Sequence, residues 1–516
     1  MTLVLPARLN IAEEFVGRPA REHPDRLAIL GDPQPVTYAQ LGSLTARVAG
    51  ALASLECRAG DRILLVLPDS AEFMASFFGA AMAGAIAVPV NSAARPADYA
   101  HYLADCGARF AIVHRDSLAS VLANREAAAL ERLIVVGDAP VPAAPPAAAW
   151  DAWLALARPA ARPVPTAAAD PAFFLYTSGS GGMPRAAVHR HRDMLVTSAC
   201  YARGVLGLRS DDRTFSVSKL FFAYGLGNGM YFPLGLGAST ILDPGRPRPE
   251  SAVEIVARHR PTVFFAVPTF YGALLAKVEQ GLPADFSSVR MAVSAGEPLP
   301  AEIFERFRRR FGLEILDGIG STEMLHMFLS PCPGRTRAGS CGFPVPEYSA
   351  RIVDEDGRDV SRGAIGNLWV RGESAFAGYW NNPELTAIVK RGEWVVTGDK
   401  FFQDADGFFH YCGRSDDMMK VAGRWVAPAE VENALLAHPA VAEAAVVGHS
   451  FDGLTRPVAY VVLGAGQGSD PRLARRLREF VHGRLPSYKM PVEVHFVSEL
   501  PRTATGKIQR FKLRRS

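Results

Sequence analysis

The sequence predicts an α/β fold: a large N-terminal body of mixed sheets flanked by helices plus a small β subdomain, followed by a small mobile α+β C-terminal domain. The chain has 516 residues, enough for about three or four folding units. Residues 60–300 alternate short apolar runs with helical stretches, as parallel sheets with crossover helices do. Residues 340–412 instead hold short strands between Gly- and Asp-rich turns, which is typical of a small, mostly antiparallel unit.

The composition excludes several classes of protein. Hydrophobic residues make up 49% and charged residues 21%, which is ordinary for a globular chain. Lys and Arg number 56 against 52 Asp and Glu, and this net charge of +4 is too small to predict nucleic acid or a membrane as a partner. The six cysteines form no CxxC pair, so we expect a reducing, cytoplasmic location.

One segment meets the crude length of a membrane span, because residues 73–90 carry no charge. Its context favours a buried strand, helix and strand instead. A strand-like run at 62–67 precedes it, Asp69 and Glu72 make a helix-start signal, and residues 85–88 read as the next strand.

The other predicted elements follow the same patterns. Within the body, strands are expected at 111–113, 133–136, 262–265 and 289–293. Residues 139–170 are rich in Pro and Ala and are expected to form a surface connection. Strands of the β subdomain are expected at 351–353, 366–371, 394–396 and 408–411.

The last hundred residues predict a separate α+β domain. We expect a helix at 431–438 and strands at 441–447, 456–463 and 492–497. A second helix should begin after the cap Asp470 and bury one apolar face made of Leu473, Leu477, Phe480 and Val481. The polar run 413–417 is the expected hinge, so we predict an N-terminal domain at 1–414 and a C-terminal domain at 415–516.

A loop of small residues at 175–185, Leu-Tyr-Thr-Ser-Gly-Ser-Gly-Gly-Met-Pro-Arg, is the most informative stretch. An apolar strand runs into glycines and hydroxyl residues, which let backbone N–H groups approach an anion. Neither a Walker A motif nor GxGxxG is present. Alone, the stretch is equally compatible with an anion-binding loop and with a glycine-rich turn.

Six motifs together resemble the adenylate-forming enzymes, a superfamily of acyl- and aryl-CoA synthetases, luciferases and peptide-synthetase adenylation domains. In the order of that superfamily, they lie at 177–185, 294–298, 317–323, 397–399, 413–417 and 501–507. Residues 221–228 and 323–329 most resemble the benzoate–CoA ligase branch. The resemblance implies an acid–thiol ligase that activates benzoate, an aminobenzoate or a hydroxybenzoate through acyl-AMP. It would transfer the acyl group to CoA, releasing AMP and pyrophosphate, with ATP, Mg²⁺ and coenzyme A as cofactors.

The resemblance also assigns the ATP site. The pyrophosphate end would be bound by Thr177, Ser178, Gly179, Ser180, Gly182 and Arg185. Thr322 would contact the α-phosphate, and Glu323 would hold Mg²⁺. Adenine would be bracketed by Gly296, Glu297, Pro298, Asp317, Gly318 and Ile319, and the ribose held by Asp399 and Arg414. The alternatives are a surface glutamate at 323 and a hairpin salt bridge between Asp399 and Arg414.

Lys507 is the expected catalytic cation, placed between the carboxylate and the α-phosphate where charge develops. Alternatively, it is one more basic residue in a basic tail. For the thiol step, the resemblance implies rotation about Asp416, which presents the loop of Lys420 and Gly423 to the acyl-adenylate. Gly423 would let the pantetheine pass close to the backbone, unless it only turns a hairpin.

The aryl pocket is assigned to a mixture of flat aromatic and small residues: Phe222, Ala223, Tyr224, Gly320, His326 and Met327. Tyr224 or His326 would meet a ring substituent, although aromatic residues at such spacing also occur in ordinary cores. No histidine spacing predicts a metal. The Asp404–Gly407 run lacks the pattern of a calcium loop and is expected to be a turn.

Three positions depart from the superfamily pattern: Arg185 replaces Lys, Ala186 replaces Gly, and Gly181 replaces Thr. Arg185 keeps the positive charge, but loss of a hydroxyl at 181 removes one phosphate donor. Two further hypotheses therefore stay open, an enzyme that loads a carrier-protein thiol and a non-catalytic homologue. Expected partners are a small aromatic acid and either CoA or a carrier protein, with a homodimer as a candidate assembly.

Overall fold

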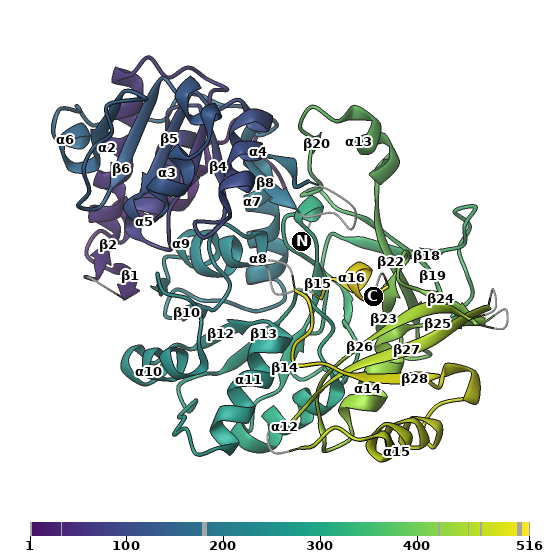
Figure 1. The fold of residues 1–516 in the computed structure, drawn as a ribbon. Coiled ribbons are helices and arrows are strands. Elements are labelled where there is room, and N and C mark those ends of the chain that lie inside the picture. Colours follow the sequence, from purple (N-terminus) through teal and green to yellow (C-terminus); the bar gives the residue numbers. More distant parts are fainter. Residues whose placement is uncertain are drawn as a thin grey trace.

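The computed structural model describes residues 3–31, 34–177, 183–421, 424–451, 454–464, 467–502 and 508–514. It confirms the predicted fold class, an α/β body of several sheets, a β unit and a smaller α+β part at the C-terminus (Figure 1). The boundary between residues 414 and 415 stays a prediction.

The first sheet has eight strands in the order β20-β9-β8-β4-β3-β5-β6-β7 and lies at the upper left of Figure 1. Its strands are β3 (Arg62–Val66), β4 (Ile86–Pro89), β5 (Phe110–His114), β6 (Arg132–Val136), β7 (Ala147–Ala149), β8 (Pro171–Thr177), β9 (Arg185–Arg190) and β20 (Gly378–Tyr379). The run from β8 to β7 is parallel, whereas β9 is antiparallel to both β8 and β20. This antiparallel edge places Gly378 and Tyr379 beside Val188 and Ala187 of β9.

As predicted, residues 73–90 form a buried helix followed by a strand, β4, of this sheet. Helix α3 (Ala71–Met82) connects β3 to β4. No helix in the described ranges is long and apolar enough to cross a membrane. The predicted helix start was wrong in one detail: Ser70, not Asp69, caps α3 by accepting a hydrogen bond from the Phe73 N–H. Asp69 is instead buried and binds a distant loop.

The prediction for residues 139–170 was also incomplete. The segment contains β7 and a helix, α6 (Trp150–Ala155), besides surface turns. Trp150, Trp153 and Leu154 are buried in the main core. The high Pro and Ala content predicted a surface segment, although the segment contains these three large side chains. Their burial stabilises the edge of the first sheet.

The second sheet has seven strands in the order β14-β13-β12-β10-β11-β1-β2. These are β1 (Leu27–Gly31), β2 (Val36–Thr37), β10 (Arg213–Ser216), β11 (Ser239–Leu242), β12 (Val263–Ala266), β13 (Met291–Ser294) and β14 (Ile315–Asp317). All neighbours are parallel except the β1–β2 pair. The carboxyl ends of β13 and β14 therefore meet at one edge, facing the centre of the molecule.

Helices cover both sheets. Around the first sheet lie η1 (Glu13–Gly17), α1 (Arg18–Glu22), α2 (Tyr38–Ser54), α4 (Pro96–Cys106), α5 (Arg115–Leu122) and η2 (Arg125–Ala129). Between the sheets lie α7 (His191–Thr197), η3 (Ser198–Arg203), α8 (Ala223–Leu226), η4 (Gly227–Tyr231) and α9 (Phe232–Gly235). Against the second sheet pack α10 (Pro249–His259), α11 (Pro268–Glu279) and α12 (Ala301–Phe311).

The β unit is antiparallel, as predicted. It contains β18 (Ser349–Val353), β19 (Gly366–Arg371), β21 (Lys390–Arg391), β22 (Trp394–Gln403) and β23 (Phe409–Arg414), with α13 (Pro383–Val389) at one end. A separate small sheet joins β15 (Ile319–Gly320), β16 (Met327–Ser330) and β17 (Phe343–Pro344), and the turn η5 (Thr322–Met324) lies between the first two. Residues 404–407 form a turn closed by the Asp404 carboxylate, in agreement with the turn interpretation.

The C-terminal part has its own core, and its predicted helices and strands are confirmed. They are β24 (Met419–Val421), β25 (Arg424–Val426), α14 (Pro428–Leu436), β26 (Val441–Phe451), β27 (Leu454–Leu463), α15 (Pro471–His482), η6 (Ser487–Lys489), β28 (Glu493–Phe496) and α16 (Arg510–Leu513). Leu473, Leu477 and Val481 of α15 are buried in this core. Phe480 is only half-buried, because its ring instead packs 3.5 Å under the guanidinium of Arg484.

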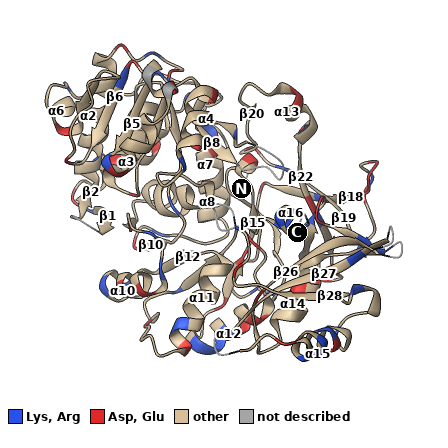
Figure 2. Ribbon diagram, viewed as in Figure 1, with Lys and Arg blue, Asp and Glu red and all other residues tan. Residues whose placement is uncertain are grey.

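Basic residues are concentrated on two helices at the lower rim of the molecule, α12 and α15 (Figure 2). On α12 much of that charge is paired: Arg306 binds Glu279 at 2.7 Å, and Arg308 binds Glu305 at 2.7 Å. Exposed pairs of this kind contribute little to stability. These paired surface charges on α12 therefore do not indicate a phosphate-binding site. We expect the cations that bind phosphate to lie in the interior.

The cap of α15 gives the first testable prediction. Asp470 accepts a hydrogen bond from the Leu473 N–H. Replacing it by Ala should lower the free energy of opening the first turn by about 1 kcal/mol, whereas Asp470→Asn keeps an acceptor. Amide hydrogen exchange over residues 471–476 of the full chain measures this. Equal exchange in the two variants would show that the cap contributes nothing.

Candidate functional site

The predicted phosphate loop lies at the open end of the β8–β9 hairpin. Thr177 and Arg185, which flank the loop, are directly opposite each other in the antiparallel register. Both side chains are half-buried. The predicted residues Ser178, Gly179, Ser180 and Gly182 lie outside the described residues, as does Gly181.

Thr322 and Glu323 lie in the turn η5, which Ser321 caps by accepting a hydrogen bond from the Met324 N–H at 3.3 Å. The Tyr379 hydroxyl donates to Glu323 Oε1 at 2.6 Å. Because β20 pairs with β9, this tyrosine comes from the same sheet edge as the phosphate hairpin. The strand pairing thus connects the two predicted phosphate-binding segments.

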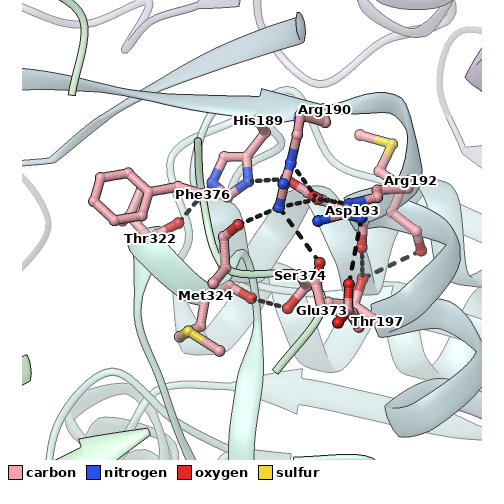
Figure 3. A network of polar contacts seen from close by, with 12 residues as sticks. His189, Arg190, Arg192, Asp193, Thr197, Thr322, Met324, Glu373, Ser374 and Phe376 are labelled. Atoms are coloured by element: carbon pink, nitrogen blue, oxygen red, sulfur yellow. Dashed lines mark hydrogen bonds and ion pairs between the residues drawn. The ribbon is translucent and has the colours of Figure 1, made fainter. Parts of the chain in front are cut away.

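The backbone of this turn is held by donors from two other segments (Figure 3). His189 of β9 contacts the Thr322 carbonyl oxygen through Nε2 at 2.7 Å. The Phe376 N–H donates to the Glu323 carbonyl at 2.7 Å, and the Ser374 hydroxyl donates to the Met324 carbonyl at 2.8 Å. Three consecutive carbonyl groups are therefore fixed, which sets the directions of the Thr322 and Glu323 side chains.

The segments predicted to bracket adenine meet at the carboxyl ends of β13 and β14. Ser294 and Asp317 are register partners, and the Gly318 N–H donates to the Ser294 carbonyl at 3.0 Å. Gly296 adopts a φ of +94°, a conformation that favours glycine. Gly296 and Pro298 are exposed, so a ligand could reach this edge.

The Asp317 side chain is turned into the protein. One carboxyl oxygen accepts from the Leu299 N–H at 3.3 Å, and burial raises the pKa of Asp317 to about 8. A carboxyl group that is largely protonated near neutrality positions the 296–299 loop better than it would attract a cation. Whether its backbone contacts adenine stays a prediction.

Asp399 and Arg414 face each other across the β22–β23 pair. They are register partners, and Arg414 NH1 lies 3.3 Å from Asp399 Oδ1. The same nitrogen donates to the Thr397 carbonyl at 2.8 Å. The geometry alone is that of the hairpin salt bridge considered above, and binding of ribose hydroxyls by this pair stays a prediction.

The C-terminal part contacts the predicted adenine segment. Arg502, at the start of the motif that carries Lys507, lies 3.7 Å from Glu297 and 2.8 Å from Glu443. Lys507 itself lies outside the described residues. A cavity of about 30 Å³ is lined by residues of both parts: Pro298, Tyr411, Gly413, Arg414, Asp417, Pro428, Ala429 and Arg510. Arg502 thus lies beside the predicted adenine segment in this arrangement.

The loop predicted for the thiol step lies elsewhere. Lys420 is exposed on the β24–β25 hairpin, where its ammonium faces the Trp425 ring, and Gly423 is outside the described residues. Figure 1 shows this hairpin at the right-hand edge, apart from β15. The hinge candidate Asp416 is exposed and lies 3.8 Å from the Arg414 guanidinium. The structure therefore does not bring Lys420 to Thr322 and Glu323.

The predicted aryl-pocket residues gather around His326. Its ring lies 5.7 Å from that of Tyr224, 5.2 Å from Tyr201 and 4.6 Å from Phe232, measured between centroids. Burial lowers the pKa of His326 to about 3, so the imidazole is neutral. A Cβ atom at Gly227 would lie 2.5 Å from the imidazole ring, which shows how closely the ring is packed.

The other members of that set lie nearby. Phe222 is the N-cap residue of α8 and Ala223 begins the helix, while Gly320 closely approaches the His326 backbone, which leads into the buried Met327. The Tyr224 hydroxyl donates to the Val293 carbonyl at 3.2 Å, so its proton is already used within the protein. Of the two candidates for contacting a ring substituent, His326 is the better placed.

Asp69, which was predicted as part of a helix-start signal, instead anchors the aromatic segment, residues 221–228. Its carboxylate accepts from the Leu220 N–H at 2.8 Å and lies 3.8 Å from the Lys219 ammonium. Burial raises the pKa of Asp69 to about 6, and the nearby ammonium opposes the rise. Lys219 and Leu220, which precede the aromatic segment, are thus held by Asp69 beside the first sheet.

Glu323 suits a magnesium ion that arrives with phosphate. One carboxylate oxygen accepts from Tyr379, and the side chain is half-exposed. No cluster of three or more His, Cys, Asp or Glu side chains that could hold a metal exists in the part of the chain that the structure describes. Mg²⁺ usually takes one or two protein carboxylates, with waters and substrate phosphates as the remaining ligands. The donor set therefore fits magnesium bound together with a nucleotide.

Several residues near the site escaped the sequence analysis. The unpredicted neighbours are Asp69, His189, Asp193, Tyr201, Lys219, Phe232 and Tyr379. Of these, Asp69 was predicted only as part of a helix-start signal, and His189 was considered only as a metal ligand, for which its spacing does not fit. The Gly378–Tyr379 pair offered no local signal, since its role depends on pairing with a strand about 190 residues earlier.

Two family profiles match the chain. The AMP-binding enzyme profile matches residues 16–380, and the profile of the AMP-binding enzyme C-terminal domain matches residues 430–507. Together they include most of the described secondary structure, with a gap that spans the predicted hinge.

Similar proteins extend over nearly the whole length. The chain is 42% identical to the benzoate–CoA ligase of Thauera aromatica, which covers 99% of this chain and 96% of the relative. It is 40% identical to the 4-hydroxybenzoate–CoA/benzoate–CoA ligase of Rhodopseudomonas palustris, over 98% and 94% of the two chains. The crystal structure of the anthranilate CoA ligase AuaEII in complex with anthranoyl-AMP matches with a TM-score of 0.94 and 39% identity, over 99% and 98% of the chains.

The burial of Asp69 predicts a pH-dependent contribution to stability. Its folded pKa of about 6 exceeds the unfolded value, so the folded state holds the proton longer and stability falls as pH rises from about 4 to 6. The free energy of unfolding of the wild type, relative to Asp69→Asn, should decrease by about 2 kcal/mol between pH 4 and pH 7.

Denaturant unfolding across that pH range measures the difference. The exposed Asp25→Asn serves as a control and should show no such trend. A wild-type advantage over Asp69→Asn that grows with pH would contradict the assignment.

Proposed function

We propose that this chain, which belongs to the AMP-binding enzyme family, is an ATP-dependent aryl-CoA ligase. It activates benzoate, an aminobenzoate or a hydroxybenzoate as an acyl-adenylate and transfers the acyl group to CoA, releasing pyrophosphate and AMP. The names of the full-length relatives support both the aromatic acid and the thiol, and the related structure with anthranoyl-AMP supports the intermediate.

One observation carries the proposal: the Thr322–Glu323 turn connects the phosphate hairpin to the aromatic cluster. On one side Tyr379 ties Glu323 to the edge of the first sheet, beside Thr177 and Arg185. On the other side the chain continues within three residues to His326 and its aromatic neighbours. A planar acid among those rings would therefore lie next to the α-phosphate of a nucleotide bound at the turn.

The first half-reaction brings a carboxylate to the α-phosphorus of a polyanion, so the site must offset charge and hold an in-line geometry. Arg185 offers a guanidinium at the pyrophosphate end, and Thr322 a hydroxyl at the α-phosphate. Magnesium, held by Glu323 and phosphate oxygens, would neutralise part of the developing charge. Lys507 supplies a cation between the carboxylate and the phosphate.

The second half-reaction requires the C-terminal part to move. The contact between Arg502 and Glu297 supports an arrangement in which the Lys507 motif serves adenylation. The outlying β24–β25 hairpin would then replace it for thioester formation, by rotation about Asp416. In that state Gly423 would border the pantetheine path.

The neutral environment of the aromatic cluster favours an uncharged ring over a charged substituent. His326 is neutral, and its Nδ1 has no hydrogen-bond partner within the described residues. A small donor or acceptor on the ring, such as a hydroxyl or an amino group, would satisfy that nitrogen.

All six cysteines are free, which supports a reducing, cytoplasmic location.

A pyrophosphate-release screen over substituted benzoates tests the function. With an accepted acid, release should be ATP-dependent, and adding CoA should convert the bound acyl-AMP to thioester and free AMP. Comparison of CoA with a phosphopantetheinylated carrier protein identifies the acceptor. Acyl-AMP that persists in the presence of CoA would exclude the CoA ligase, and the absence of release with every acid would indicate a non-catalytic homologue.

Removal of the Lys507 ammonium should separate the two half-reactions. Lys507→Ala should reduce adenylation by at least about a hundredfold, because a charge placed at the transition state is lost, yet retain thioester formation from supplied acyl-AMP. Lys512→Ala is the matched control, since it removes a lysine from the same basic tail. Equal losses in both half-reactions of Lys507→Ala would contradict the alternation of the two loops.

A further inference from the structure

His189 lies on the strand that leaves the phosphate hairpin, four residues beyond Arg185, and its side chain is fully buried. Its ring stacks on Phe173 of the neighbouring strand, with centroids 5.2 Å apart and planes inclined by 18°. Figure 3 shows the imidazole between the Thr322 backbone on one side and Asp193 on the other. Both ring nitrogens therefore have a polar partner.

The first partner can only accept. Nε2 lies 2.7 Å from the Thr322 carbonyl oxygen, which has no proton to offer, so Nε2 must carry hydrogen.

The second partner also only accepts. Nδ1 lies 3.0 Å from Asp193 Oδ2, and the same oxygen accepts from the Arg190 N–H at 3.0 Å. The other carboxylate oxygen accepts from Arg190 Nε at 3.2 Å. Donors thus converge on both oxygens, as an ionised carboxylate requires, and Nδ1 must carry hydrogen as well.

The charged surroundings agree with this assignment. The ionisable groups that face the pair are Arg190, Arg192, His191, Lys390, Tyr231, Tyr348 and, through Arg192, Glu373. Arg190 and Arg192 place positive charge beside Asp193, and the Asp193 carboxylate lies against the imidazole. The face of the Phe173 ring further favours a cation at this distance. Burial of the pair is tolerated because each charge is matched and hydrogen-bonded.

We propose that His189 is a buried imidazolium that acts as a positioning residue, setting the Thr322–Glu323 turn relative to the phosphate hairpin. Of the three donors to the carbonyls of η5, it is the one that comes from β9 itself. A charge-assisted hydrogen bond is shorter and stronger than a neutral one. This contact therefore fixes the distance between the pyrophosphate end and the α-phosphate end of the nucleotide site. The inference rests on the proposed function.

The protonation state can be measured without any assay of activity. Full-length protein labelled with ¹⁵N-histidine should show a ring with two protonated nitrogens at pH 8, where an exposed histidine is neutral. The resonance is assigned by its loss in His189→Gln. A neutral ring at pH 8 would overturn the inference, and this experiment on the wild type decides the point even if a variant fails to fold.

Kinetics test the positioning role. His189→Leu removes donor and charge, and should lower kcat/KM for ATP in the adenylation step by about tenfold to a hundredfold, the range typical of groups that orient a ligating residue. His189→Gln retains a neutral donor and should lose less. Thioester formation from supplied acyl-AMP should be nearly unchanged in both variants.

His191→Gln is the matched control. It also replaces a buried histidine, but one whose Nδ1 accepts from the Ile11 N–H and not one that contacts the Thr322 carbonyl, so it should leave kcat/KM for ATP unchanged. Unaltered adenylation in His189→Leu would overturn the positioning role. A wild type that releases no pyrophosphate would refute the proposed function instead, while the NMR result would still decide the charge on His189.

Discussion

The pairing of β9 with β8 and with β20 is the interaction on which the geometry of the candidate site depends. The β8 pairing places Thr177 opposite Arg185. The β20 pairing delivers Tyr379 to Glu323, and the interior face of β9 delivers His189 to Thr322. Backbone ladders define their register to a single residue, since a slip by one turns every side chain to the opposite face. One strand thus orients three separate parts of the proposed phosphate site.

The site divides into two environments with opposite electrostatic character. At the phosphate end, charged groups occur in matched pairs, such as Asp193 with its histidine and arginine partners. Around the aromatic cluster, burial instead suppresses charge, as the neutral His326 shows. In the proposed site, a nucleotide and a planar acid would therefore meet where a polar, donor-rich surface adjoins an apolar one. That boundary suits a reaction that joins a polyanion to an aromatic carboxylate.

Local signals predicted much of the fold. Alternation of apolar runs located the parallel strands of both large sheets, and the Asp470–Pro471 pair located the start of α15. Such features depend on neighbours along the chain, and the sequence contains them directly. Where local signals conflicted with tertiary contacts, prediction failed. Asp69 resembles a helix cap but binds Leu220, and the Pro- and Ala-rich stretch conceals Trp150 and Trp153 in the core.

The order of six short motifs was enough to identify an adenylate-forming enzyme, because each motif is a local arrangement of small, hydroxyl-bearing and charged residues. Which residues support those motifs was decided only by the tertiary structure. His189 contacts a carbonyl 133 residues away, and Tyr379 a carboxylate 56 residues away. Hydrogen bonds between distant segments produce no periodic pattern in the sequence, because they depend on strand order and register. The sequence therefore determined the chemistry of this protein, and the packing of its sheets decided how that chemistry is held in place.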